Sequence, residues 1–284
     1  MDPSLAVLLA KLSEYYLCRS NKQVIAMDLG LKGRSALITG GSKGIGLAAA
    51  VSLASEGCNV HLAARTASDL EASAASLRAK YNVEVTVHAV DLSNGDAARA
   101  LVDAHANVEI LVNNAGAIPA GSITDIDETR WREAWDLKVF GYQNMCRAML
   151  GHMREKGRGV IVNVIGAAGE APTPGYIAGS AGNASIMALT RALGATSREY
   201  GVRVVGINPG LIATDRMVTL MKTKAQAKFG DESRWRELQD QVYPPGMPEH
   251  VGDMVAFLAS DRSANTTGTI ITIDGGSSAR GPAL

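Results

Sequence analysis

The stretch TGGSKGIG, residues 39 to 46, is the most informative part of this sequence because of what flanks it. An apolar, β-forming run, SALITG, leads into it, and a helical run, LAAAVSLASEG, follows it. Glycines in such a loop let the backbone turn tightly and approach a pyrophosphate, and the amides at the helix start meet the negative charge. A glycine-rich stretch alone is a weak signal. The strand before it and the helix after it predict a dinucleotide-binding loop.

Outward from this loop, short β-rich runs alternate with helical stretches. The runs are SALITG (35–40), NVHLAAR (59–65), EVTVHAVDL (84–92), VEILVNNAG (108–116), GVIVNVIG (159–166), VRVVGINPG (202–210) and TIITIDGG (269–276). Nearly continuous apolar strands that alternate with helices are typical of a parallel sheet covered on both faces. We therefore predict a doubly wound α/β Rossmann fold, whose ligand crevice lies at the carboxyl ends of the strands.

The composition limits the possible partners and the cell compartment. A chain of 284 residues with 46% hydrophobic content can bury one sizeable core, which favours a single domain. Lys and Arg equal Asp and Glu at 28 each, which argues against nucleic acid or an anionic membrane as a partner. No apolar run reaches the roughly 18 residues that span a bilayer. We expect a soluble, cytoplasmic protein.

Cysteine and histidine usage argues against a disulfide framework and against a metal site. Cys18, Cys58 and Cys146 are an odd number, lie far apart and include no CxxC pair, and no histidine stands at metal-ligand spacing. Buried, unreactive thiols are the simpler interpretation. The prediction is that the protein binds no metal.

The first 26 residues form a separate N-terminal extension in our prediction, ahead of the Rossmann domain at 27–284. Leucines recur at helical spacing between Leu5 and Leu12, whereas Lys11 and Glu14 interrupt the run, so the pattern indicates an amphipathic helix and not a secretory signal. Such a helix could dock on a neighbouring subunit or shield a site. The alternative is a plain extension before a core that begins at Met27.

Residues 211 to 248 form the most irregular segment of the domain. The segment opens with LIATDR, continues through a polar helical patch and closes with YPPGMPEH. Its length, polarity and place beyond a strand end favour a mobile helical substrate lid. The alternative is a solvated helix pair that does not contact a ligand.

The end of the second strand indicates which dinucleotide binds. Where an acidic residue would bind the ribose 2′-hydroxyl of NAD, this chain has Ala64 followed by Arg65, and Lys43 lies inside the glycine loop. Two cations without a carboxylate suit a 2′-phosphate. The prediction is NADP(H) in preference to NAD(H); the alternative is that both cations are ordinary surface residues.

Together the motifs TGGSKGIG, DL (91–92), NNAG (113–116), NPG (208–210) and IDGG (273–276) resemble the short-chain dehydrogenase/reductase family over residues 30 to 278. The resemblance implies an oxidoreductase of a small-molecule carbonyl or alcohol that assembles as a homo-oligomer, a dimer or tetramer. It places the cofactor against Gly40, Ser42, Lys43, Gly44, Ile45, Gly46, Arg65, Asp91, Leu92, Asn114, Ala115, Gly116, Pro209, Gly210 and Thr214.

Proteins of this family use a serine, a tyrosine whose pKa a nearby lysine lowers, and an asparagine that organises the proton relay. If Tyr176 were the family's tyrosine, Ser180 would take the lysine position and Asn163, inside a strand, the serine position. That register puts the interior of the strand where its end should be.

The flanking landmarks VIGAAG and LTRALG give a better register. In it, Gly166 takes the serine position, Gly179 the tyrosine position and Asn183 the lysine position. All three standard groups are then absent. The resemblance also puts Lys138, in WREAWDLKVFGYQN, where the family has its asparagine, so asparagine and lysine have exchanged helices.

We hypothesise a displaced catalytic set. Tyr176 stands three residues before Gly179 and would reach the site from one helical turn earlier, as proton donor. Lys138 would lower its pKa, and Asn183 would bind the ribose or a water. Two alternatives stay open: Lys138 is a solvated helix residue, or Tyr176, preceded by two prolines, belongs to a loop.

The glycines of this region support a second functional hypothesis. Gly166, Gly169, Gly175, Gly179 and Gly182 empty the site of side chains, which would either admit a bulky substrate or leave an inert pocket. In the second case the protein would be catalytically silent and would bind NADP(H) as a sensor or as a partner subunit. The retained cofactor motifs favour hydride transfer, whereas the absent standard groups oppose it.

Overall fold

The apolar runs of the sequence form the strands of one parallel sheet in the computed structural model, which describes residues 27–240, 242 and 244–279. The strands are β1 (Ser35–Thr39), β2 (Asn59–Ala64), β3 (Val85–Ala89), β4 (Ile110–Asn113), β5 (Gly159–Val164), β6 (Val202–Pro209) and β7 (Ile270–Ile273). Their order is β3-β2-β1-β4-β5-β6-β7, with every pairing parallel. The order reverses between β1 and β4, which is where such a sheet opens its ligand crevice.

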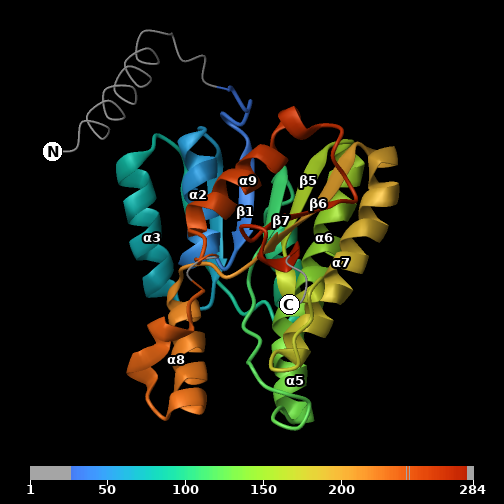
Figure 1. Ribbon diagram of the computed structural model, residues 1–284. Coiled ribbons are helices and arrows are strands. Elements are labelled where there is room, and N and C mark those ends of the chain that lie inside the picture. The colour runs from blue at the N-terminus through green and yellow to red at the C-terminus, as the bar shows by residue number, and fades with distance from the viewer. Residues whose placement is uncertain (1–26, 241, 243, 280–284) are drawn as a thin grey trace, which may run out of the picture.

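Helices cover both faces of the sheet, as predicted (Figure 1). They are α2 (Gly44–Ser55), α3 (Ala67–Lys80), α4 (Gly95–Ala104), α5 (Glu128–Trp135), α6 (Gly141–Lys156), α7 (Ile177–Ser197), α8 (Asp215–Phe229) and α9 (Pro248–Ala259). Successive strand residues point to opposite faces. Ile38 therefore packs with α2, α3 and α9 in one core, and Leu37 packs with α4 and α6 in another. The single-domain Rossmann fold is confirmed.

A π-helical turn, η1 (Asp136–Phe140), joins α5 directly to α6, with no loop between the helices. Such an insertion of one wide turn changes the direction in which the side chains around it point, and it is frequent at functional sites. Here it coincides with Lys138, which is buried, while Phe140 two residues on is 47% exposed. The π turn therefore directs the lysine inward.

The segment predicted as a lid forms α8 and a 3₁₀ helix, η4 (Glu232–Leu238). These elements project beyond the carboxyl ends of the strands, opposite α5 (Figure 1). The extension at residues 1–26 lies outside the described residues, so its predicted amphipathic helix stays a prediction.

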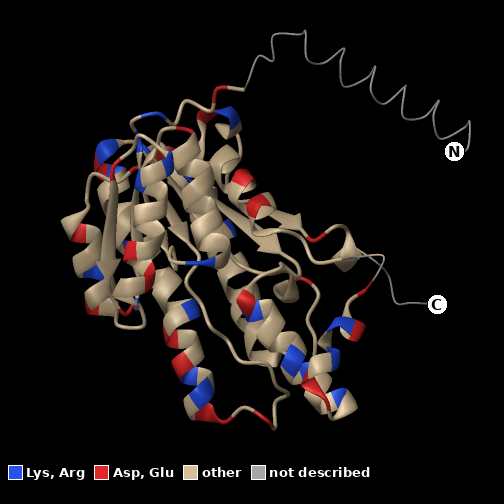
Figure 2. Cartoon of the chain, turned by 90° about the vertical axis from the view of Figure 1, so that its left-hand side faces the viewer, with Lys and Arg blue, Asp and Glu red and all other residues tan. Residues whose placement is uncertain are grey.

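The charges are interspersed over the helices, with Lys and Arg beside Asp and Glu (Figure 2). This distribution agrees with the equal numbers of cations and anions in the sequence. In the part of the chain that the structure describes, no helix has both the length and the apolar character that a bilayer span requires.

Candidate functional site

A cleft of about 920 Å³ opens at the carboxyl ends of the strands. The cleft is lined by all the predicted site residues except Gly46 and Asp91: the lining set is Gly40, Ser42, Lys43, Gly44, Ile45, Arg65, Leu92, Asn114, Ala115, Gly116, Lys138, Tyr176, Asn183, Pro209, Gly210 and Thr214. Residues predicted from separate motifs thus share one cavity, large enough for a dinucleotide and a small substrate.

The glycine loop has a conformation that only glycine fits. Gly40 and Gly44 have φ of +66° and +57°, in the left-handed region. A Cβ on Gly46 would lie 2.1 Å from the carbonyl oxygen of Gly40. Gly46 is therefore a packing residue behind the loop, which explains why it does not line the cleft.

The end of β4 fastens this loop in place. The Asn114 side-chain amide donates to the carbonyl oxygens of Thr39 and Gly40 at 3.0 and 3.2 Å. In return, the hydroxyl of Thr39 accepts from the backbone amides of Asn114 and Ala115 at 2.8 and 3.0 Å. Thr39 was not predicted as a site residue, although it opens TGGSKGIG. These bonds hold the two strands together at the switch point of the sheet.

The two cations of the predicted dinucleotide site, Lys43 and Arg65, are both exposed and line the same cavity. Asp69, in the first turn of α3, lines it too and was missed by the sequence reasoning. Asp91 lies outside the lining: hydrogen bonds from the Ser93 amide and hydroxyl lower its pKa, and Arg65 lowers it further. Arg65 therefore lies near the Asp91 carboxylate.

Lys138 is 7% exposed and belongs to a closed triangle of polar groups. Its Nζ donates to the Tyr142 hydroxyl at 2.7 Å and to the carbonyl oxygen of Val164 at 2.8 Å, and the Tyr142 hydroxyl donates to the same carbonyl at 2.6 Å. Burial holds the pKa of Lys138 well below its ordinary value, with Arg216 as a second cause. The solvated alternative for Lys138 is therefore excluded.

Tyr142 was missed by the sequence reasoning, although it stands four residues after Lys138. It is the phenol that Lys138 contacts, and burial raises its pKa well above the ordinary value. Tyr142 does not line the cleft, so it positions the lysine from behind.

Tyr176 precedes the first residue of α7, so it is the N-cap of the helix and not part of its first turn. Its ring nevertheless fills the space beside Gly179, where a Cβ would lie 2.1 Å from two ring carbons. The phenol oxygen accepts from Nη2 of Arg216 at 3.4 Å. Burial raises the pKa of Tyr176, and Arg216 opposes that shift.

The cation beside Tyr176 is therefore Arg216, whereas the sequence had predicted Lys138 in that role. The reason is that Lys138 points to Val164 and Tyr142, inside the domain. Arg216 comes from α8 and also donates to the carbonyl oxygens of Gly116 at 2.6 Å and of Ile118 at 3.1 Å. It ties the predicted lid to the segment after β4.

Asn183 is buried, with 4% of its surface exposed. Its amide lies against Gly166, where a Cβ would come within 2.7 Å of Nδ2. Gly116 stands in the same relation to Lys138: a Cβ there would lie 2.4 Å from Cδ of the lysine. Each predicted catalytic side chain thus occupies space that one glycine leaves open.

Glu170 and Ser180 hold the loop before α7. The Glu170 carboxylate accepts from the Asn208 amide at 3.3 Å and from the Thr272 hydroxyl at 2.9 Å. Ser180 is buried and accepts from the backbone amide of Thr173 at 3.2 Å. Both act as supports of the cleft wall.

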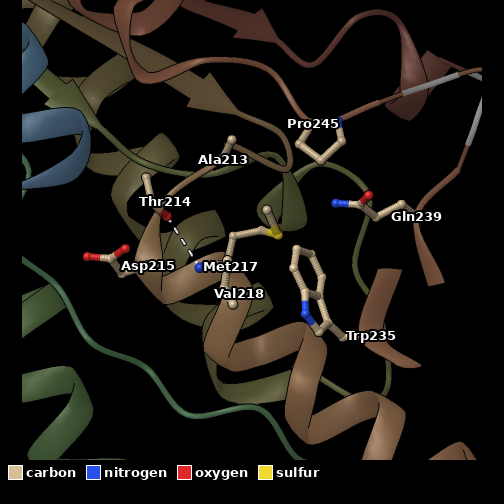
Figure 3. Close-up of a pocket in the computed structure, with 8 residues that line it drawn as sticks. All are labelled: Ala213, Thr214, Asp215, Met217, Val218, Trp235, Gln239 and Pro245. Carbon is tan, nitrogen blue, oxygen red and sulfur yellow. Dashed lines mark hydrogen bonds between the residues drawn. The ribbon is translucent and has the colours of Figure 1, made fainter. Parts of the chain in front are cut away.

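A smaller pocket of about 370 Å³ lies between α8 and η4 (Figure 3). Thr214 lines both this pocket and the main cleft, and it caps α8 by accepting from the backbone amide of Met217 at 3.3 Å. Trp235 and Met217 point into the pocket from the two lid elements (Figure 3). The pocket between the start of α8 and η4 is therefore largely apolar.

Comparison with known proteins agrees with this geometry. Residues 34–225 match the short chain dehydrogenase family. The chain is 34% identical to 2-keto-3-deoxy-L-fuconate dehydrogenase of Xanthomonas campestris, over 87% of this chain and 80% of that protein. It is 28% identical to a 3-oxoacyl-[acyl-carrier-protein] reductase of Chlamydia trachomatis, over 87% and 98%.

Solved structures give the same result. L-sorbose reductase from Gluconobacter frateurii, in complex with NADPH and L-sorbose, is 30% identical with a TM-score of 0.81, covering 88% of this chain and 98% of that chain. An NAD⁺-bound xylitol dehydrogenase is 26% identical with a TM-score of 0.80, covering 87% and 99%. The similar structures thus include proteins with either nicotinamide cofactor.

Proposed function

This chain belongs to the short-chain dehydrogenase/reductase family, and from that premise we propose that it is an NADP(H)-dependent oxidoreductase of a carbonyl/alcohol pair with a rearranged proton-donor site. One observation carries the proposal. Tyr176, Lys138 and Asn183 fill the spaces beside Gly179, Gly116 and Gly166, and all three line the cofactor cleft. Simple loss of the serine and the tyrosine would leave empty space at Gly166 and Gly179, whereas Asn183 and Tyr176 fill that space.

Tyr176 is the proton donor in this proposal. A guanidinium only donates hydrogen bonds, so the phenol oxygen accepts from Arg216 and keeps its own hydrogen for the substrate oxygen. As that proton leaves, Arg216 faces the phenolate that forms and stabilises it. The pairing assigns to the lid a direct role at the reacting oxygen.

Lys138 and Asn183 position the reactants. The aliphatic part of Lys138 lies against Gly116 in the cleft wall, and the Val164 carbonyl fixes its amine; we assign to this amine a hydrogen bond to the nicotinamide ribose. Among the described residues, the Asn183 side chain has no hydrogen-bond partner, so its amide is available to the substrate oxygen or to a water. These two roles replace the predicted influence of Lys138 on Tyr176.

The cofactor fits the residues present. Gly40 and Gly44 line the cleft with left-handed backbone conformations that favour glycine, next to the start of α2, where backbone amides bind a pyrophosphate. Bound NADPH would supply the hydride. Lys43 and Arg65 line the cleft where a 2′-phosphate would meet them, and this pair favours NADP(H) although Asp69 opposes it.

A catalytically silent NADP(H)-binding protein is the second candidate function. The observation that favours it is the glycine at each of positions 166 and 179, where the family resemblance expects serine and tyrosine. A sensor or partner subunit would keep the glycine loop and need no proton donor. The homo-oligomer and the lid role of α8 remain predictions under either function.

The test is NADPH binding followed by turnover. Purified protein is titrated with NADPH by fluorescence, and NADPH oxidation is then followed with a panel of ketoses, keto acids, ketones and aldehydes. For an enzyme with this site, Tyr176→Phe lowers kcat by about 100-fold or more and leaves the NADPH Kd unchanged. Tight binding without turnover on any carbonyl would support the silent protein.

A further inference from the structure

Three of the five histidines of the chain meet at one place outside the cleft. His61 comes from β2, His88 from β3 and His105 from the residue that caps α4. The ring centroids are 5.8 Å apart for His61 and His88, 4.6 Å for His61 and His105, and 4.3 Å for His88 and His105. The sequence predicted no metal site because its spacing hides this cluster, which forms only through the parallel sheet.

The backbones of the three residues are held by regular structure. His61 lies opposite Leu37 of β1 on one side and Thr86 of β3 on the other, and His88 lies opposite Ala63 of β2. The His105 amide donates to Val102 and its carbonyl accepts from Val108, both at 3.0 Å. Folding has therefore already met the entropic cost of bringing the rings together.

The chemistry of the cluster suits a metal more than a proton. One ring nitrogen from each histidine can be chosen so that all three lie within 4.8 Å of one another. Imidazole groups alone make up this cluster of described residues, and all three are partly buried. A neutral imidazole is the form that coordinates a metal.

Thr86 supports the arrangement from inside the cluster. Its hydroxyl lies 2.6 Å from Nδ1 of His61 and 3.3 Å from Nε2 of His88. Histidines that bind metals commonly have their second ring nitrogen hydrogen-bonded, which fixes the ring. A hydroxyl can both donate and accept, so Thr86 can serve either tautomer while each ring keeps a second nitrogen.

We propose that His61, His88 and His105 form a binding site for a zinc-class dication that cross-links β2, β3 and the end of α4. Three imidazoles with one open position are a ligand set that Zn²⁺ accepts, completed by a water. Zn–N bonds of about 2.1 Å place the ligand nitrogens of a tetrahedral site about 3.4 Å apart. The present ring nitrogens lie within 4.8 Å of one another, so binding would require the rings to move closer together.

The site would act on the edge of the sheet. β3 is the outermost strand beside β2, and an edge strand is paired on one side only. A metal bound by His61, His88 and His105 would fasten β3 to its neighbour strand and to α4. None of the three histidines lines the cofactor cleft, so the effect to measure is stability and not turnover.

The experiment uses the full, untagged chain, freed of metal by a chelator and titrated with ZnCl₂ by calorimetry. We expect about one Zn²⁺ per chain and a rise in Tm of about 3 °C or more at saturation. Co²⁺ in place of Zn²⁺ gives a visible spectrum that reports a tetrahedral nitrogen site. The matched variants are His88→Gln and His105→Gln, with His250→Gln, a histidine outside the cluster, as the control.

The proposal predicts that His88→Gln and His105→Gln weaken Zn²⁺ binding by at least about tenfold and abolish the Tm rise, while His250→Gln behaves as the wild type. NADPH binding by each variant shows that it is folded. No zinc binding by the folded wild type, or equal binding by all four proteins, would overturn the proposal.

Discussion

The ring of Tyr176 occupies the space that a side chain on Gly179 would need, at 2.1 Å from a Cβ built there. The family resemblance places a tyrosine at position 179 itself. In this chain a phenol therefore reaches the corresponding region from the N-cap of α7, and the glycine three residues later is what admits it. A side chain at position 179 is incompatible with the present position of the Tyr176 ring.

Gly179→Ala should displace this phenol. The added methyl group cannot coexist with the present ring position, and a misplacement of about 1 Å at a reacting group costs roughly 100-fold in rate. We expect kcat to fall by about that factor with an unchanged NADPH Kd, measured by NADPH oxidation and fluorescence. Gly175→Ala is the control, since nothing lies within 4 Å of a Cβ there. Equal rates in both variants would contradict the assignment of Tyr176.

Arg216→Ala should change the pH dependence of the reduction. A phenol that donates a proton is active below its pKa, so the rate falls as pH rises through that value. Arg216 opposes the rise that burial produces in the pKa of Tyr176, so its removal raises that pKa further. The alkaline limb of kcat should move to higher pH. The control is Lys222→Ala, on the same helix, which should leave the alkaline limb of kcat in place. An unchanged limb in Arg216→Ala would exclude contact between Arg216 and Tyr176 during turnover.

Lys138→Met should separate catalysis from stability. Replacing a buried cationic side chain by an apolar one of similar volume is often neutral for folding, because the cost of desolvating the charge disappears as well. We expect the free energy of unfolding to stay within about 1 kcal/mol of the wild type, by urea denaturation. The Tyr142 hydroxyl keeps its bond to Val164. In the Lys138→Met variant, kcat should fall at least about tenfold relative to the wild type. A large loss of stability with full activity would make Lys138 a structural residue.

Arg65→Ala should weaken NADPH binding selectively. A hydrogen bond to a charged group contributes about 1.5–3 kcal/mol, so we expect an NADPH Kd about 10- to 100-fold higher, with the NADH Kd nearly unchanged. Asp69→Asn should act in the opposite direction, because it removes a negative charge from the cleft that Arg65 also lines. Arg99→Ala, an exposed cation that pairs with Asp96 away from the cleft, is the control. Equal losses for both dinucleotides would refute the 2′-phosphate role.

Cys58 and Cys146 should be unreactive in the folded protein. Both are buried, and burial raises the pKa of each thiol to about 12. At pH 8 only about one thiol in ten thousand is then ionised, and the thiolate is the reactive form. In a Cys18→Ser variant, a maleimide should label neither cysteine until the protein is unfolded in urea, as followed by mass spectrometry. Rapid labelling of the native variant would show that one of them is accessible.

Local patterns were sufficient for the fold and for most of the cleft. Strand and helix periodicity and the glycine loop depend on near neighbours in the chain, and the parallel order of the strands then brings their carboxyl ends to one edge. The predicted residues at 40–46, 114–116 and 209–214 accordingly meet in one cavity, with Gly46 behind the loop. The register that puts Gly166 and Gly179 at the family's serine and tyrosine positions stays a prediction.

Tertiary structure alone decided which groups contact one another. Arg216 contacts Tyr176 from 40 residues away because α8 lines the cleft, whereas the π turn directs Lys138 to Tyr142. The three histidines meet because adjacent parallel strands align residues from distant segments. Burial, which no short stretch of sequence encodes, lowers the pKa values of His61 and His88. Sequence determined the scaffold of this protein, and packing between distant segments determined its chemistry.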